Sequence, residues 1–137
     1  MSLTLKRSLI LFLLHRFTKG MKLEAIDPLN PSCICVTSVV EVVGSRLRLH
    51  FDGYSDSYDF WENSNSENLF PVGWCLKNNQ ALQPPKGFTK NNFDWEAYLN
   101  VTNSIGATEP LFQNKIRSKI STEGWRQRMK RIFEVPF

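Results

Sequence analysis

The chain has 137 residues, enough for one domain with a modest core but too few for two. Its composition is that of an ordinary globular protein, with 42% hydrophobic and 22% charged residues. The formal net charge of +4 arises at the two ends, because residues 1–20 carry four basic groups and no acid and residues 113–137 carry seven basic groups against two acids. The acidic stretch between them argues against a basic nucleic-acid-binding face.

Residues 1–19 form a basic and apolar extension. A Lys-Arg pair precedes the apolar run 8–14, which resembles the start of a signal peptide. The run is too short to span a bilayer, two polar residues end it, and no small-x-small cleavage site follows. We therefore expect a helix packed on the domain or a poorly ordered extension, and no membrane partner.

The sequence predicts β structure from Met21 onward. Residues 34–43 are rich in β-branched side chains, Gly44 and Ser45 form a turn, and residues 46–51 alternate between polar and apolar. This pattern is typical of a half-buried antiparallel hairpin. The second strand then has one apolar face and one solvent face, formed respectively by Leu47, Leu49 and Phe51 and by Arg46, Arg48 and His50.

Shorter strands are expected next. Residues 62–68 are a polar loop, residues 69–75 a further short strand and residues 77–80 a turn. Residues 82–85 close the sheet in extended form, since each proline there lacks a backbone donor. Five or so short strands within about seventy residues are typical of a small barrel.

After Gly87 the sequence predicts a helical segment. Asn92 can cap a short helix over residues 93–100, with Trp95 and Leu99 on one side and Tyr98 beside them. This segment has too little core of its own and must pack on something.

Residues 113–137 form a basic tail in which a helix is predicted from about Thr122. A basic amphipathic helix can bind acidic partners or membranes, and a solvated terminal helix is the simpler interpretation. Weak, non-specific nucleic-acid contact and a loose nuclear import signal are further interpretations of the same tail.

The three cysteines, Cys33, Cys35 and Cys75, are predicted to be reduced thiols of a cytosolic or nuclear protein. Cys33 and Cys35 lie two apart in an extended strand, which hinders a mutual disulfide. With only His15 and His50 elsewhere, the C-x-C pair falls short of a zinc site. We expect no metal and no cofactor.

The sequence also argues against an enzyme. It contains no G-x-S-x-G motif, no glycine-rich phosphate loop and no histidine placed to activate a cysteine. Asp52, Asp56 and Asp59 resemble paired catalytic carboxylates, but such groups on a loop are usually solvated. His50 is expected to be an ordinary strand residue.

The run 51–61 combines aromatic and acidic side chains at the end of a predicted strand. Ring faces and carboxylates both attract an organic cation, so this composition suits a cation pocket. Most aromatic residues of a small barrel belong to the core, which is the simpler interpretation. Two features favour a pocket: Tyr54 and Tyr58 lie among loop-forming residues, and Asp27 and Asn30 each precede a proline that stiffens their loop.

The sequence resembles the malignant brain tumour (MBT) repeat in five motifs that occur in order across residues 20–112. They are GMKLEAIDPLNP at 20–31, RLHFDG at 48–53, YDFW at 58–61, PVGWC at 71–75 and LQPP at 82–85. The resemblance implies a mainly β fold, a five-stranded Tudor- or SH3-like barrel of the chromatin Royal superfamily. The barrel would occupy residues 20–88 and a helical arm residues 89–112.

The resemblance also implies a function. Members of the family bind mono- and dimethyl-lysine, typically on histone tails, and act in transcriptional repression and chromatin compaction. The implied protein is a nuclear, non-enzymatic reader whose partners are methylated histone tails or other methyl-lysine peptides and chromatin repressor complexes. By position, the family's cage aromatics fall on Phe51, Tyr54 and Tyr58, its acidic partner on Asp27, and a supporting residue on Asn30.

The chain also departs from the family pattern. The second cage aromatic is often Trp in the best-binding repeats, so Tyr54 implies weaker binding. MBT repeats normally occur in tandem, each barrel packed against a neighbour's arm, whereas one barrel is predicted here and residues 1–19 do not resemble the usual arm. The arm is expected to fold back on its own barrel or to swap into another chain, which would give self-association. The alternative function is a structural or scaffolding module with an unused cage.

Overall fold

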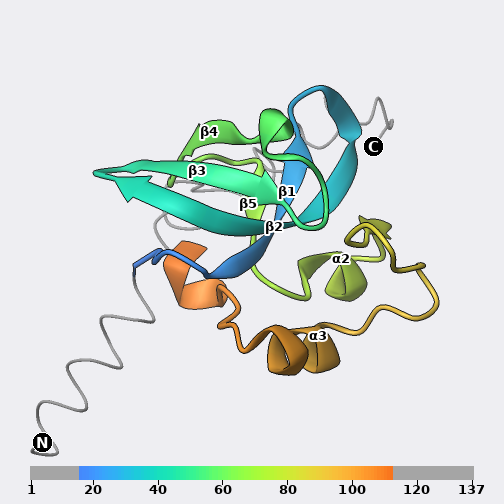
Figure 1. Ribbon diagram of the computed structural model, residues 1–137. Coiled ribbons are helices and arrows are strands. Elements are labelled where there is room, and N and C mark those ends of the chain that lie inside the picture. Colours follow the sequence, from blue (N-terminus) through green and yellow to red (C-terminus); the bar gives the residue numbers. More distant parts are fainter. Residues whose placement is uncertain (1–15, 113–137) are drawn as a thin grey trace, which may run out of the picture.

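The computed structural model describes residues 16–112. Its central feature is one long strand, β2 (Asn30–Val43), that takes part in two hairpins. The first part of β2 pairs antiparallel with β1 (Lys22–Asp27) and the second part with β3 (Arg46–Phe51). Because a single strand belongs to both hairpins, the sheet curls around it (Figure 1).

Three short strands complete the sheet. β4 (Phe60–Asn63) pairs with β3, β5 (Leu69–Phe70) pairs with β1, and β6 (Leu82–Gln83) runs parallel to β2. The strand order is β4-β3-β2-β1-β5, with β6 beside β2 off this path. The mainly β, barrel-like fold expected from the sequence is therefore confirmed, as a curled half-barrel. Its sheet has six strands and not five, since β4 begins inside the aromatic run and extends into the predicted loop.

The hydrophobic core lies inside the curl. Leu47 and Leu49 of β3 are fully buried, which confirms the predicted alternation. Burial of each such side chain stabilises the fold by about 1.5–3 kcal/mol. The main cluster comprises Met21, Leu23, Ala25, Val39, Leu47, Leu49, Leu69, Ala107 and Phe112, and a second one comprises Ile26, Ile34, Phe70 and Cys75.

The prediction of a strand over residues 69–75 is wrong beyond Phe70. Pro71 lacks the N–H that a ladder needs, and Gly73 has φ +90°, a left-handed conformation that ends extended structure. A short helix, α2 (Trp74–Lys77), follows at once. The Trp74 ring stacks on the Phe70 ring with centroids 4.1 Å apart, which fixes α2 beside β5.

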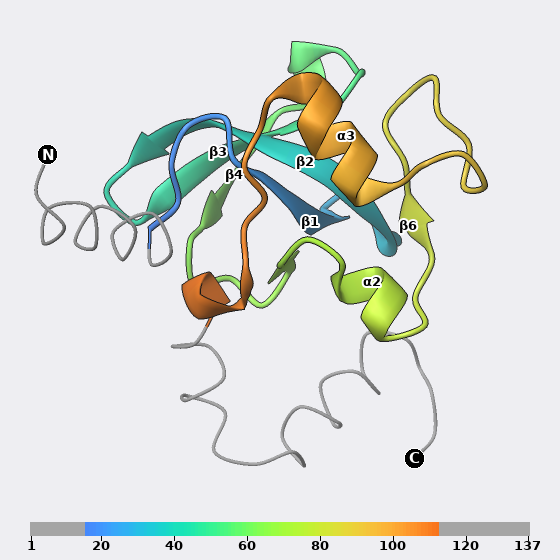
Figure 2. The ribbon, with the colours of Figure 1, turned by 90° about the horizontal axis from the view of Figure 1, so that it is seen from below.

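The predicted helix after the barrel is present as α3 (Trp95–Thr102), and it begins later than expected. Asp94 is the N-cap, because its carboxylate accepts a hydrogen bond from Ala97 N at 2.9 Å. Asn92 instead accepts a hydrogen bond from Thr89 N and does not cap the helix. Figure 2 shows α3 lying across β1 and β2 on one side of the sheet.

The chain after α3 returns to the barrel. Gly106 forms a bridge with Lys22, and Ala107 N donates a hydrogen bond to Lys22 O at 2.8 Å. The 3₁₀ turn η2 (Glu109–Phe112) then places Phe112 in the main core cluster. The arm thus packs on the barrel of its own chain, which was the first of the two arrangements expected from the sequence.

The predictions for residues 1–15 and for a tail helix from about Thr122 lie outside the described residues. In the part of the chain that the structure describes, no helix is long and apolar enough to cross a membrane.

Candidate functional site

A cavity of about 590 Å³ lies at the ends of β1 and β3, next to the start of β4 and to β6. Four of the five residues singled out from the sequence line it: Asp27, Phe51, Tyr54 and Tyr58. Asp27 lies more than twenty residues before the three aromatic residues in the sequence, and the curl of the sheet brings it beside them. The remaining lining is mainly apolar and includes Pro28, Cys33, Val36, Phe60 and Pro84.

The aromatic wall of the cavity is built on the end of β3 and the loop after it. Phe51 packs against Phe60 with ring centroids 5.2 Å apart, so one ring of the wall rests on the barrel. Tyr54 and Tyr58 are 39% and 56% exposed, respectively, and present their rings from the loop. Phe60 both packs against the main core and lines the cavity.

The loop that presents Tyr54 and Tyr58 is held by local hydrogen bonds. Tyr54 N donates to Phe51 O at 3.0 Å. Ser55 caps the 3₁₀ turn η1 (Asp56–Tyr58) by accepting a hydrogen bond from Ser57 N at 3.2 Å. Lys86 Nζ lies 6.0 Å from the centroid of the Tyr54 ring, at the limit of cation–π distance.

The acidic side of the cavity is Asp27, the last residue of β1. The register of β1 against β2 shifts between Ile26 and Asp27, and such an irregularity redirects a side chain. Oδ1 of Asp27 accepts a hydrogen bond from Leu29 N at 2.9 Å, which fixes the carboxylate over the turn. Within residues 16–112 this is its one hydrogen bond, so the other oxygen remains available as an acceptor.

Asn30 lies outside the lining of this cavity. Its Nδ2 donates to Cys33 Sγ at 3.2 Å and its Oδ1 accepts from Ser32 Oγ at 2.8 Å. Cys33 lines the cavity, so Asn30 contacts a lining residue without lining the cavity itself. Its supporting role stays a prediction.

The family model of the MBT repeat matches residues 21–89. The chain belongs to the MBT repeat family. It is 52% identical over 99 residues to human lethal(3)malignant brain tumor-like protein 4, a match that covers 72% of this chain and 16% of that protein. It is 48% identical over 102 residues to mouse lethal(3)malignant brain tumor-like protein 1, covering 74% of this chain and 12% of that protein.

A solved structure is also similar. It contains the four MBT repeats of Drosophila melanogaster Sfmbt in complex with the methylated peptide RHR(me)KVLR, with a TM-score of 0.66 and 36% sequence identity. The match covers 72% of this chain and 24% of the Sfmbt chain. This MBT chain therefore corresponds to a small part of each of these relatives.

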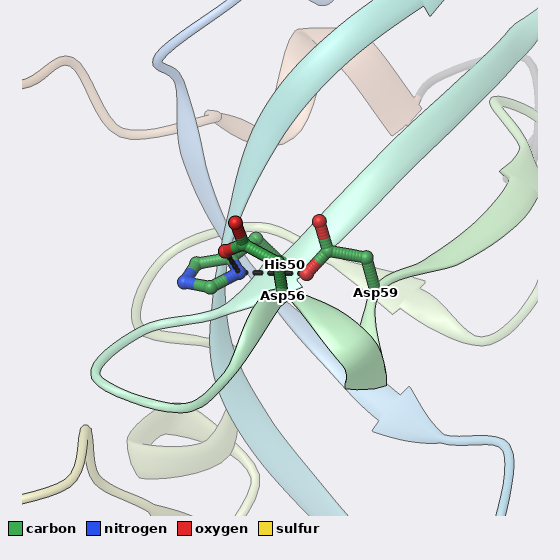
Figure 3. Close-up of side chains that lie close together, drawn as sticks. All are labelled: His50, Asp56 and Asp59. Atoms are coloured by element: carbon green, nitrogen blue, oxygen red, sulfur yellow. Dashed lines mark hydrogen bonds and ion pairs between the residues drawn. The ribbon is translucent and has the colours of Figure 1, made fainter.

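A histidine and two carboxylates meet beside the cavity of this MBT repeat (Figure 3). His50 Nδ1 lies 2.6 Å from Asp59 Oδ1 and 3.5 Å from Asp56 Oδ1. Two ligands of one zinc ion are about 3.3 Å apart, whereas 2.6 Å is a hydrogen-bond distance. The contact thus ties η1 to β3 and supports no metal assignment. The His50 side chain is 20% exposed, so its predicted place on the solvent side is only partly correct.

The prediction that Asp52 is solvated is wrong. Asp52 is 5% exposed, and its carboxylate accepts hydrogen bonds at 2.6 Å from Lys22 Nζ, Ser38 Oγ and Tyr98 OH. The Asp52 hydrogen bond and burial both raise the pKa of the Tyr98 hydroxyl, burial having the larger effect. Lys22, the first residue of β1, is itself only 8% exposed, and a buried lysine requires an acidic partner such as Asp52.

Glu24 is the second buried carboxylate that the sequence did not reveal. It is fully buried in β1 and accepts hydrogen bonds from Gly73 N, Cys75 N and Trp95 Nε1 at 2.7–2.8 Å. The first two donors belong to the start of α2 and the third to α3. Glu24 therefore joins both helices of the MBT repeat to its sheet.

The cysteines of this MBT repeat are free thiols, as predicted. Burial is the main cause that raises the pKa of Cys35 to about 12. Burial and the neighbouring Glu24 carboxylate raise the pKa of Cys75 as well. Both thiols therefore keep their protons at neutral pH and are poor nucleophiles.

Proposed function

We propose that this MBT repeat is a non-enzymatic module that binds mono- or dimethyl-lysine in a peptide. The observation that carries the proposal is the joint placement of one incompletely hydrogen-bonded carboxylate, Asp27, and three aromatic rings around a single cavity. The rings supply negative π faces and the carboxylate supplies an acceptor, which together match an alkylated ammonium group.

The chemistry explains why the methylated form is preferred. Methyl groups lower the hydration of the ammonium ion, so its transfer into an aromatic cavity costs less than that of unmodified lysine. Mono- and dimethyl-lysine keep an N–H that the second Asp27 oxygen can accept. Trimethyl-lysine has no N–H, so it loses this hydrogen bond and binds more weakly.

The peptide in the Sfmbt structure supports the proposal. That protein, 36% identical to this chain, is in complex with a peptide that carries a methylated lysine between basic residues. The acidic middle of the present chain would favour such a basic segment electrostatically. We extend the proposal to methylated histone tails as partners, to nuclear localisation and to chromatin repressor complexes, in keeping with the MBT family.

The expected affinity is modest. Each ring contributes about 0.5–2 kcal/mol and the cavity accepts one side chain, which corresponds to a Kd on the order of 10–1000 μM.

A panel of one peptide in four methylation states tests the proposal. We expect chemical-shift changes at Tyr54 and Tyr58 with the mono- and dimethyl forms, smaller changes with the trimethyl form and none with unmodified lysine. NMR titration of the full chain measures these changes. A flat response to all four peptides would overturn the proposal.

The second candidate is a structural or scaffolding MBT module with an unused cage. Exposed apolar side chains on both helices favour it, because Leu76 of α2 and Val101 of α3 are 87% and 85% exposed. Tyr54 in place of the usual Trp is consistent with it too. In that case the peptide titration is flat and the helices, not the cavity, contact the partner.

A further inference from the structure

Two side chains of α3 donate hydrogen bonds to two buried carboxylates of the barrel. Tyr98 OH donates to Asp52 at 2.6 Å, and Trp95 Nε1 donates to Glu24 at 2.7 Å. The two hydrogen bonds are chemically similar, but their carboxylates lie at different distances along the chain from the residues that line the cavity. Asp52 lies between the cage residues Phe51 and Tyr54, whereas neither Glu24 nor its partners line the cavity.

Asp52 is fixed from three directions. Lys22 of β1, Ser38 of β2 and Tyr98 of α3 all donate to its carboxylate. The Tyr98 ring also lies 5.2 Å from Lys22 Nζ, so the helix contacts both members of the buried ion pair. Removal of the Tyr98 donor leaves the carboxylate buried with fewer partners, and it would move toward the remaining two.

The backbone at Asp52 transmits such a movement to the cage. Asp52 N donates to Val36 O at 3.3 Å, and Val36 itself lines the cavity. Lys86 N donates to Asp52 O at 3.2 Å, and a Cβ on Gly53 would lie 2.9 Å from Lys86 Cβ. The turn is therefore tightly packed, and Asp52 cannot shift without moving Phe51 or Tyr54.

We infer that Tyr98, acting through Asp52, is a positioning residue for the cage, so that docking of α3 on the barrel sets the geometry of Phe51 and Tyr54. The inference rests on the proposed function of the cavity and adds a role for the arm. No residue of α3 lines the cavity, so the helix acts on the cage through Asp52, in the turn between Phe51 and Tyr54.

The chain supplies a matched pair of variants. Tyr98→Phe removes the donor to Asp52 and keeps the ring that packs on Phe88 and Phe93. Trp95→Phe removes the donor to Glu24 and keeps an aromatic ring beside Tyr98. Each variant removes one hydrogen bond between α3 and a buried carboxylate, but only Tyr98→Phe removes one next to the cage residues.

The three tyrosines of the chain make the test specific. Incorporation of 3-fluorotyrosine gives one ¹⁹F signal each for Tyr54, Tyr58 and Tyr98, and the variant at position 98 leaves the two cage signals. In the ligand-free full chain we expect Tyr98→Phe to shift the Tyr54 signal and Trp95→Phe to leave it unchanged. With a dimethyl-lysine peptide we expect Kd to rise about threefold to tenfold in Tyr98→Phe and less than about twofold in Trp95→Phe.

Equal Tyr54 signals and equal Kd values in the two variants would overturn the inference. If the parent chain binds no methylated peptide, the proposed function fails, yet the ligand-free Tyr54 signal still decides whether Tyr98 positions the loop. If Tyr98→Phe does not fold, Ser38→Ala removes another donor from the same carboxylate. An unchanged Tyr54 signal in that variant would overturn the inference as well.

Discussion

The three aromatic residues of the proposed cage differ in how firmly they are held. Phe51 ends β3 and packs on Phe60, whereas Tyr54 and Tyr58 stand on the loop and are substantially exposed. A ring on a loop contributes its π face to a ligand but little to the core. Its identity can therefore be changed with a small effect on stability.

Tyr54→Trp should strengthen binding of a dimethyl-lysine peptide. Indole has the strongest cation–π face of the natural side chains, so we expect Kd to fall about twofold to tenfold. Calorimetric titration measures the change, and thermal unfolding should show that the fold is unaffected. Weaker or unchanged binding would mean that this ring does not face the ligand.

The positions of two aspartates, Asp27 and Asp52, differ in how well the sequence predicts them. Asp27 was placed at the pocket because its loop is stiffened by proline and matches a family motif, and the structure brings it to the cavity. Asp52 was expected to be solvated, yet it is buried by partners 14, 30 and 46 residues away. Local composition does not contain such contacts, so burial of a charged group could not be predicted.

At the scale of elements, the hairpin and the helices differ in predictability. The β2–β3 hairpin follows from β-branched content and strict alternation over a long stretch. Helix α2 was missed because it has only four residues, Trp74–Lys77, and its position depends on Glu24 accepting from its first N–H groups. The start of α3 was misplaced because Asn92 and Asp94 are both good capping residues and only Asp94 is used.

Glu24→Ala should destabilise the fold strongly. The change leaves three donors on α2 and α3 without an acceptor, one of them buried and two partly buried, so we expect a loss of about 3–5 kcal/mol in the free energy of unfolding. Urea denaturation measures it. The exposed Lys77–Glu109 pair provides the control, since Glu109→Ala should cost less than about 1 kcal/mol. Similar small losses in both variants would contradict the structural role of Glu24.

Docking of α3 should depend on pH in the alkaline range. The pKa of Tyr98 is raised in the folded chain by burial and by Asp52, so the folded state retains this proton after the unfolded state has lost it. The contribution of Tyr98 to stability is therefore complete below about pH 10 and falls as the pH rises above that value. Unfolding in urea at a series of pH values measures the slope.

Tyr98→Phe is the control for this pH dependence. We expect a shallower loss of stability above pH 10 in the variant than in the parent, because phenylalanine does not ionise. Identical slopes would show that Tyr98 titrates alike in both states.

At the scale of the whole molecule, one curled sheet and one arm form a single MBT repeat. The barrel was predictable because the motifs span it from end to end and because short β-branched segments alternate with turns. The attachment of the arm was not, since it depends on Glu24, Asp52 and the return of Phe112 to the core. Within residues 16–112 the arm packs on the barrel of the same chain.

In the proposed function, Asp27 is the acidic group that receives the methylammonium. Calorimetric titration of a dimethyl-lysine peptide into the parent chain, Asp27→Asn and Asp56→Asn tests it most directly. Both variants remove one negative charge near the cavity, but Asp56 is almost fully exposed and outside the lining. We expect at least a tenfold loss of affinity, roughly 1.4 kcal/mol or more, in Asp27→Asn and a change of less than about twofold in Asp56→Asn. Equal affinities of the parent and Asp27→Asn, with the fold intact, would contradict the account.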